Sequence, residues 1–459
     1  MSAALKPYPA YRDSGVDWLP KLPAHWDFVR NGRLFAERNE TGFPDLPILE
    51  VSLRTGVRVR DMEGGRKQQM ADRTKYKRAA EGDIAYNIMR MWQGAVGIAP
   101  CDGLISPAYV VARSFGSVEP RFYTYLFRTT GYMREVDFAS RGIVPDRNRL
   151  YWQYFKPLLS PVPPPEEQRR IADFLDAYTA QVHRLIAAKR RTIAALIERK
   201  QAIIEGLLGA GVGKASASIC HPVVGQMPGH WRVARLKDWC HVNARTLPES
   251  TPKDFTFDYF DISVVGTGAL TGEPQSMAFE AAPSRARRRL APNDILISTV
   301  RTYLKAIYFF QGWPREAIAS TGFAVLSPKA GVLPELIAYA LMTPRFIDVV
   351  ISRSVGVAYP AIAETRLSAL HLALPNDESE QELILDNIKS DTQLVDEAVA
   401  KERSQIDLIL EYRDSLIAAV VTGQLDVRDV TIPVVEGDDF ADDTSTDDED
   451  MEDALDAVD

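Results

Sequence analysis

The sequence predicts an α+β protein: two α/β domains in tandem pseudo-repeat, separated by two long helices that form an antiparallel coiled coil, with a disordered acidic C-terminal tail. Three observations predict this architecture. A short phrase around His-Trp occurs twice, a long helical stretch follows each copy, and the C-terminus is almost purely acidic. A chain of 459 residues is too long for one ordinary core and suits about two to three domains.

The two domains are predicted from a repeat that runs through the whole chain. "LPAHWDFVRNGRLF" begins at Leu22, and "MPGHWRVARLKDWC" begins at Met227. "EGDIAYNIMR" from Glu81 returns as "PNDILISTVR" from Pro292, so each half has an Asp-Ile pair and an Arg seven residues after that Asp. Short β-rich runs bounded by Gly, Pro, Asn and Asp, with a few helices between them, make each half α+β. Such self-similarity predicts one fold used twice.

Each long helix is predicted from an apolar seam. Between Glu166 and Leu208 there is no Pro, and apolar residues recur in alternating steps of four and three. Each of them has an apolar counterpart 213 residues later. A 3.5-residue period sustained over this length is typical of a coiled coil. The seam residues are Leu175, Val182, Ile186, Ile193, Leu196, Ile203, Leu207, Ile388, Val395, Val399, Ile406, Ile409, Leu416 and Val420.

Two equivalent halves can pack with pseudo-two-fold symmetry, and the helices would then run antiparallel. Lys189 and Glu402 interrupt the seam near the helix midpoints and would lie close to that axis. They would either pair there or be solvated separately. The expected segments are 1–160 for domain 1, 161–212 for helix 1, 213–376 for domain 2, 377–425 for helix 2 and 426–459 for the tail.

The net charge of −8 hides two basic domains. Residues 1–160 have a net charge of +7 and residues 213–376 have +5, whereas residues 426–459 have −14. A basic domain suggests a polyanionic partner such as nucleic acid, although a merely soluble surface is the alternative. The last 24 residues contain 13 acids and no Lys or Arg, so they cannot bury a core and should be disordered.

The remaining composition excludes several classes of protein. Three cysteines make no disulfide framework, and the pairs Cys220-His221 and Cys240-His241 lack the ligand spacing of a zinc site, so no metal site is expected. No apolar run is long enough to cross a membrane, and no signal-peptide core is present. The expected location is the cytoplasm.

The doubled order of these motifs resembles the specificity (S) subunit of Type I restriction–modification systems. The resemblance covers nearly the whole chain except the tail. It includes "YRDSGVDWLPKLPAHW", "PPPEEQRRIADFLD", "MPGHW", "EQELILDNI" and "AAVVTGQLDV". It implies two target-recognition domains, each reading one half of a bipartite, asymmetric site in double-stranded DNA. The helices would dock two methyltransferase (M) subunits, and restriction (R) subunits would join through that complex.

The resemblance also implies that this chain has no catalytic residue of its own. S-adenosylmethionine, ATP and Mg would be bound by the partner subunits. The His-Trp pairs are expected to be structural, because Trp fills a core well and His can hydrogen-bond nearby backbone. Apolar residues of "RRIADFLDAY" and "ELILDNIK" exceed what one seam needs and are candidate partner contacts.

Base readout and phosphate contact both favour Arg and Lys, with aromatic residues beside them. Clusters of these residues occur in both domains, and Arg90 and Arg301 occupy matching places in the repeat. A solvated surface charge, or for the matching pair a structural ion pair, is the alternative. The candidates are Arg54, Arg58, Arg60, Lys75, Lys77, Arg78, Arg90, Arg141, Arg147, Arg149, Arg285, Arg287, Arg288, Arg289, Arg301, Tyr303, Lys305, Arg353 and Tyr359.

Two other functions compete with DNA recognition. A methyltransferase would need an Asn/Asp-Pro-Pro-aromatic loop, and "PPPEE" from Pro163 has neither flanking residue. "GAGVGKA" from Gly209 fails the phosphate-loop pattern, because it follows a helix and has Ala after the Lys. A coiled-coil scaffold that does not bind DNA is the remaining alternative.

Overall fold

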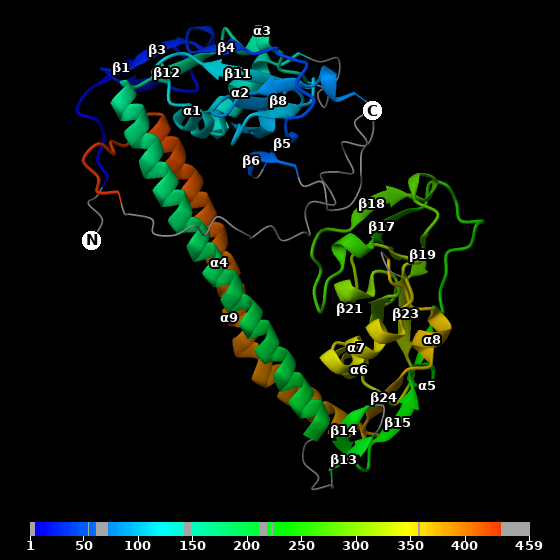
Figure 1. The fold of residues 1–459 in the computed structure, drawn as a ribbon. Helices are drawn as coiled ribbons and strands as arrows, with labels where there is room; N and C mark the ends of the chain where they lie inside the picture. The colour runs from blue at the N-terminus through cyan, green and yellow to red at the C-terminus, as the bar shows by residue number, and fades with distance from the viewer. Residues whose placement is uncertain are drawn as a thin grey trace. The chain divides into compact units, whose positions relative to one another are not determined.

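The computed structural model describes residues 5–53, 55–60, 72–141, 148–210, 218–221, 224–356 and 359–432 (Figure 1). It divides into two compact units, and each is described by itself. Unit 1 comprises Met1–Arg190 and Ser404–Asp459, and unit 2 comprises Arg191–Arg403. The long helices α4 (Pro165–Ala210) and α9 (Glu378–Val421) contribute to both units. Most of the predicted acidic tail, from residue 433 onward, lies outside the described residues.

Unit 1 is built around an antiparallel four-stranded sheet with the order β4-β11-β8-β9. Smaller antiparallel pairs surround it, and a parallel bridge from Ile48 to Leu104 links two of them. The main sheet consists of β4 (Phe35–Glu37), β11 (Tyr109–Ser114), β8 (Ile84–Asn87) and β9 (Val96–Ile98). The pairs are β1 (Tyr11–Asp13) with β2 (Lys21–Pro23), β3 (Asp27–Arg30) with β12 (Leu159–Val162), β5 (Leu49–Ser52) with β6 (Gly56–Val59), and β7 (Lys77–Ala79) with β10 (Gly103–Ile105). The helices are α1 (Pro120–Phe127), α2 (Thr130–Ala139) and α3 (Trp152–Phe155), with 3-10 turns η1 (Asn31–Arg33), η2 (Arg73–Lys75) and η3 (Met91–Gln93).

Unit 2 has a matching four-stranded sheet with the order β16-β23-β20-β21. A second four-stranded sheet has the order β18-β17-β22-β19 and contains one parallel pair, β17 with β22. The strands of the first sheet are β16 (Cys240–Val242), β23 (Phe323–Pro328), β20 (Asp294–Ser298) and β21 (Ile307–Phe310). Those of the second are β18 (Gln275–Ala278), β17 (Thr256–Phe260), β22 (Ala317–Ser320) and β19 (Ala286–Arg289). The pairs are β13 (Ser218–His221) with β14 (Gly225–Pro228) and β15 (Arg232–Arg235) with β24 (His371–Leu374). The helices are α5 (Leu236–Trp239), α6 (Pro334–Leu341), α7 (Pro344–Arg353) and α8 (Glu364–Ser368), with 3-10 turns η5 (Ile262–Val264), η6 (Phe279–Ala281) and η7 (Thr302–Leu304).

The two units share one topology. In each, the strand after the His-Trp phrase pairs with the strand that leads into a long helix: β3 with β12, and β15 with β24. The main sheets have equivalent strand orders, and two consecutive helices follow the strand at the second position of each sheet. The predicted tandem repeat of two α/β domains is therefore confirmed.

The helices α4 and α9 pack side by side and antiparallel (Figure 1). In unit 1, Leu175 lies in the same buried cluster as Leu416 and Val420. In unit 2, Ile204 lies in the same cluster as Ile384 and Ile388. Later residues of α4 thus meet earlier residues of α9, as antiparallel neighbours must. The predicted antiparallel coiled coil is confirmed.

All fourteen predicted seam residues are buried or half-buried. Polar contacts join the same helix faces: the Lys189 Nζ donates to Gln405 Oε1, and the Lys200 Nζ lies 2.7 Å from both carboxylate oxygens of Asp396. The described contact of Lys189 is to Gln405, and its pairing with Glu402 stays a prediction.

The additional apolar residues at the start of α4, beyond those that one seam needs, pack against the helix's own domain. Ile171, Phe174 and Leu175 are buried in the core of unit 1. In "ELILDNIK", Ile384 and Ile388 are fully buried in the core of unit 2, whereas Leu383 is 43% exposed. Most of this excess therefore fixes each helix to its domain and is not open to a partner. None of the helices in the described part of the chain is long and apolar enough to span a membrane.

Candidate nucleic-acid interface

The repeated His-Trp phrase binds a carboxylate in the first turn of each long helix. In unit 1, His25 Nε2 lies 2.8 Å from Glu167 Oε2, and Trp26 Nε1 donates to Glu167 Oε1 at 2.9 Å. In unit 2, His230 Nε2 lies 2.9 Å from Glu380 Oε2, and Trp231 Nε1 donates to Glu380 Oε1 at 2.9 Å. Both carboxylates are buried, and a negative charge in a first helical turn is also favourable to the helix dipole. We call this arrangement the Glu clip.

A glutamine next to each clip ties the same helix turn to a second element. Gln168 Oε1 accepts from the Glu119 backbone N–H at 3.0 Å, directly before α1. Gln381 Oε1 accepts from the Leu333 backbone N–H at 2.7 Å, directly before α6. Each amide nitrogen donates to a carbonyl just upstream of its own helix. The clip and the glutamine therefore orient each long helix relative to its domain.

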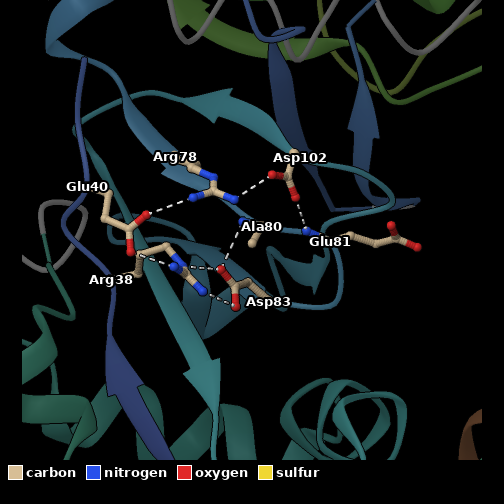
Figure 2. Close-up of polar contacts among 7 residues, drawn as sticks. All are labelled: Arg38, Glu40, Arg78, Ala80, Glu81, Asp83 and Asp102. Carbon is tan, nitrogen blue, oxygen red and sulfur yellow. Dashed lines mark hydrogen bonds and ion pairs between the residues drawn. The ribbon is translucent and has the colours of Figure 1, made fainter. Parts of the chain in front are cut away.

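The repeated Asp-Ile motif is a second framework element. Asp83 Oδ2 accepts from Arg38 Nε at 2.6 Å and from the Ala80 backbone N–H at 2.9 Å (Figure 2). Asp294 accepts from Arg245 Nη2 at 2.5 Å and from the Ala291 backbone N–H at 2.8 Å. Both aspartates are buried, and the hydrogen bond to Asp83 raises the pKa of Arg38. The buried aspartate therefore links an arginine to the turn that precedes the strand.

Arg78, a predicted DNA contact, belongs to the ion network around Asp83. Its guanidinium lies between Glu40 Oε2, at 3.1 Å, and Asp102 Oδ2, at 2.6 Å (Figure 2). The backbone N–H of Glu81 and the side chain of Arg78 lower the pKa of Asp102. Two carboxylates thus already balance Arg78, so a phosphate would have to compete with them.

Most other predicted basic residues also have partners within the protein. Arg58 and Arg60 contact Glu50, Lys75 contacts Asp72, Arg285 contacts Asp261, Arg288 contacts Glu364, and Arg289 contacts Glu316. Burial lowers the pKa of Lys77, whose Nζ donates to the Tyr109 carbonyl. Arg54 and Arg147 lie outside the described residues.

Three predicted arginines lie over aromatic rings: Arg141 over Tyr154, Arg287 over Phe279 and Arg301 over Tyr359. The backbones of Arg141 and Arg149 form an isolated antiparallel β-bridge. Lys305 and Arg353 are exposed, as are Tyr303 and Tyr359. Charge counts along the sequence do not identify these partners, because strand pairing and turns decide which side chains meet.

Arg90 and Arg301 occupy matching positions, as the repeat predicts. Each is the residue before a 3-10 turn that follows the Asp-Ile strand: η3 after β8, and η7 after β20. In each unit this turn meets the loop after the second domain helix. The Leu150 backbone N–H donates to the Ile88 carbonyl in unit 1, and the Ile362 N–H donates to the Thr299 carbonyl in unit 2. Each domain thus brings the loop after its Asp-Ile strand, which carries a basic residue, against the loop after its second helix.

The described residues hold no group of three or more His, Cys, Asp or Glu side chains able to bind a metal ion. Cys240 is buried at the start of β16, and burial raises the pKa of its thiol to about 12. A thiol this protonated is a poor metal ligand.

Comparison with known proteins finds one matching family model and several similar solved structures. Residues 228–406 match the family model described as the Type I restriction modification DNA specificity domain. A solved chain described under "complex assembly and conformational transition of the type I R-M system" is similar with a TM-score of 0.57 and 17% identity, over 88% of this chain and 99% of that one.

Two further solved structures match over most of the chain at lower TM-scores. The HsdS subunit from Thermoanaerobacter tengcongensis has 18% identity and a TM-score of 0.37, over 89% of this chain and 97% of that one. The S subunit from M. genitalium has 13% identity and a TM-score of 0.32, over 90% and 98%.

The second domain thus matches a DNA specificity domain of the Type I restriction–modification class. This match, and the similarity in fold to the solved chain, support the resemblance predicted from the doubled motifs.

Proposed function

We propose that this chain recognises a bipartite, asymmetric site in double-stranded DNA, with one half-site read by each domain. The observation that carries the proposal is the matched pair of α/β domains, each fixed by a Glu clip to the antiparallel helices. Their framework contacts agree while their loop residues differ. Two domains of one framework with different loops are suited to read two different sequences.

The candidate DNA contacts remain the predicted arginines, lysines and tyrosines, and contacts within the protein support some of them more than others. Arg301 and Lys305, on the loop after β20, are the strongest candidates. Arg78 and Arg289 are weaker, because carboxylates balance them. Recognition of a bare duplex by basic loops should weaken steeply as salt rises.

The helices are proposed to dock two methyltransferase subunits, through which restriction subunits join. Large apolar side chains on α9 are exposed without a role in either core: Leu394 is 75% exposed, Leu408 61% and Tyr412 63%. Leu408 and Tyr412 are spaced to lie on one helix face. S-adenosylmethionine, ATP and Mg would be bound by those partners, this chain would catalyse nothing itself, and the complex would act in the cytoplasm.

A domain exchange tests the proposal. Residues 1–160 are replaced by the corresponding block of a relative, the chain is co-expressed with its methyltransferase partner, and methylated sites are mapped by long-read sequencing. We expect one half of the methylated site to change and the other to stay. A change in both halves, or in neither, contradicts one domain reading one half-site.

The coiled-coil scaffold is the competing function. A scaffold would leave a duplex-DNA column at low salt, whereas a DNA-reading subunit should be retained and then released as salt rises. For docking, Leu408→Asp should reduce co-elution with the methyltransferase in size-exclusion chromatography, and Phe138→Asp, at an exposed position on α2 away from the long helices, is the control.

A further inference from the structure

Unit 2 carries an exposed ledge made of two loops that hold each other in place. The loop between β20 and β21 covers residues 299–306, and the loop between α7 and α8 covers residues 354–363, of which 357 and 358 lie outside the described residues. Val355 and Ala361 exchange two backbone hydrogen bonds of 2.8 and 3.0 Å. Thr302 Oγ1 lies 2.9 Å from Ser354 Oγ. The ledge is therefore ordered by its own contacts, without a ligand.

Two cationic residues on this ledge have strained backbones. Arg301 has a φ of +49° and Lys305 has a φ of +54°, and they bracket the single turn η7. The left-handed region is unfavourable for residues with a Cβ and persists where surrounding contacts impose it. Such strain is concentrated at ligand-binding sites, which makes this turn a candidate for direct contact with a partner.

Arg301 is oriented by a ring and not by a charge. Its guanidinium carbon lies 5.2 Å from the centroid of the Tyr359 ring, and Tyr359 is 61% exposed. Within the described residues no carboxylate forms an ion pair with Arg301, whereas Arg289 of the same unit is bound to Glu316 by two hydrogen bonds. A guanidinium that stacks through its face keeps its N–H edge available for hydrogen bonds.

We infer that Arg301, stacked on Tyr359, reads a guanine in the half-site of unit 2; this inference rests on the proposed function. The planar N–H edge of Arg matches the O6 and N7 acceptors that guanine presents in the major groove. The exposed side chains of Tyr303 and Leu304 lie in the same turn and would exclude water around that contact. The ring of Tyr359 restricts the guanidinium to one plane, which favours the bidentate geometry.

The test uses the full chain in complex with its methyltransferase partner. Methylation rates are measured on a library of duplexes in which each position of the unit 2 half-site is varied in turn. Arg301→Lys should reduce the preference for guanine at one position by about tenfold or more and leave the other positions unchanged. Tyr359→Ala should weaken the preference at the same position, and Tyr359→Phe, which keeps the ring, should retain it.

Arg315→Lys is the matched control, because that arginine of unit 2 is not a predicted DNA contact and is already paired with Asp258, and it should leave every position unchanged. A uniform loss of rate with unchanged base preference in Arg301→Lys would indicate a phosphate contact and overturn the inference. An unchanged profile would overturn it as well. Thermal unfolding of the variants excludes misfolding as the cause. If the wild-type complex itself shows no bipartite site, the proposed function fails instead.

Discussion

The two units reach the same fold with different interiors. The core of unit 1 is rich in aromatic side chains, including Trp26, Phe35, Tyr123 and Phe155. The main core of unit 2 is largely aliphatic, with Leu, Ile, Val and Ala along α6, α7 and β20. The contacts that agree are those of the Glu clip, the capping glutamine and the buried Asp-Arg pair. The comparison teaches that the framework is specified by a few polar contacts, while the cores are filled by any side chains of suitable volume.

The clips themselves differ in one respect. Glu167 also accepts a hydrogen bond from the Tyr8 hydroxyl at 2.6 Å, in addition to those from His25 and Trp26. The described contacts of Glu380 are to His230 and Trp231. Unit 1 therefore buries its carboxylate with one more donor than unit 2 provides.

The largest expected difference between the units appears at high pH. Burial raises the pKa of several tyrosines in unit 1, namely Tyr8, Tyr86, Tyr123, Tyr125 and Tyr132, whereas unit 2 has Tyr308 and Tyr339, the latter with a pKa of about 12. These groups stay neutral in the folded state but ionise in the unfolded state from about pH 10. Each buried tyrosine therefore leaves the free energy of unfolding unchanged below about pH 10. Above that pH, each one lowers the free energy of unfolding by about 1.4 kcal/mol per pH unit.

We therefore expect unit 1 to unfold before unit 2 as the pH rises above 10. Brief proteolysis at increasing pH, with the cleavage sites mapped by mass spectrometry, should find early cuts in residues 72–141. First cuts within residues 240–340 would contradict this order of unfolding.

A smaller effect should come from removing either clip tryptophan. Trp26 is 1% exposed and Trp231 is 5% exposed, so truncation to Ala leaves a cavity and removes one hydrogen-bond donor from the buried carboxylate. Each variant should lose about 3–5 kcal/mol from its own unit. Hydrogen–deuterium exchange should then accelerate in that unit more than a hundredfold, while the other unit keeps its protection. Leu394→Ala, at an exposed position, should change neither unit, and equal acceleration in both units would disprove independent clips.

The smallest effect isolates the extra donor of unit 1. Glu167→Gln should cost about 2 kcal/mol and Glu380→Gln about 1 kcal/mol, because a hydrogen bond to a charged acceptor is stronger than one to a neutral amide. In a double-mutant cycle, Tyr8→Phe and Glu167→Gln should couple by about 1 kcal/mol. Exchange rates of the peptides around each clip measure these values. Additive effects would mean that Tyr8 contributes nothing to the clip.

Much of the framework could be predicted from the sequence, and the reason is its repetition. The 213-residue offset identified the two helix seams, because helical periodicity is a local signal and the repeat shows it twice. The carboxylate that binds each His-Trp phrase was not predicted. The sequence suggests that the histidines bond to backbone, whereas Glu167 and Glu380 bind them. A signal existed, since a Glu precedes the matched Gln in both copies.

The candidate interface was less predictable. Arg78 was selected as a cation in a basic run, but sheet pairing and turns bring Glu40 and Asp102 to it. Arg301 and Tyr359 were selected separately, and only the folded loops stack them. Charge counts report how many cations a domain has, but tertiary structure decides which of them are already balanced.

In unit 1, residues near the N-terminus contact residues that follow α9. The Asp426 N–H donates to the Lys6 carbonyl at 2.7 Å, and the Arg428 guanidinium lies over the ring of Tyr8, whose hydroxyl reaches Glu167. Trimming either terminus past these residues would loosen the anchor of α4 as well as the ends themselves. An affinity tag or fluorescent fusion should therefore be attached outside residues 5–432, so that this clasp stays intact.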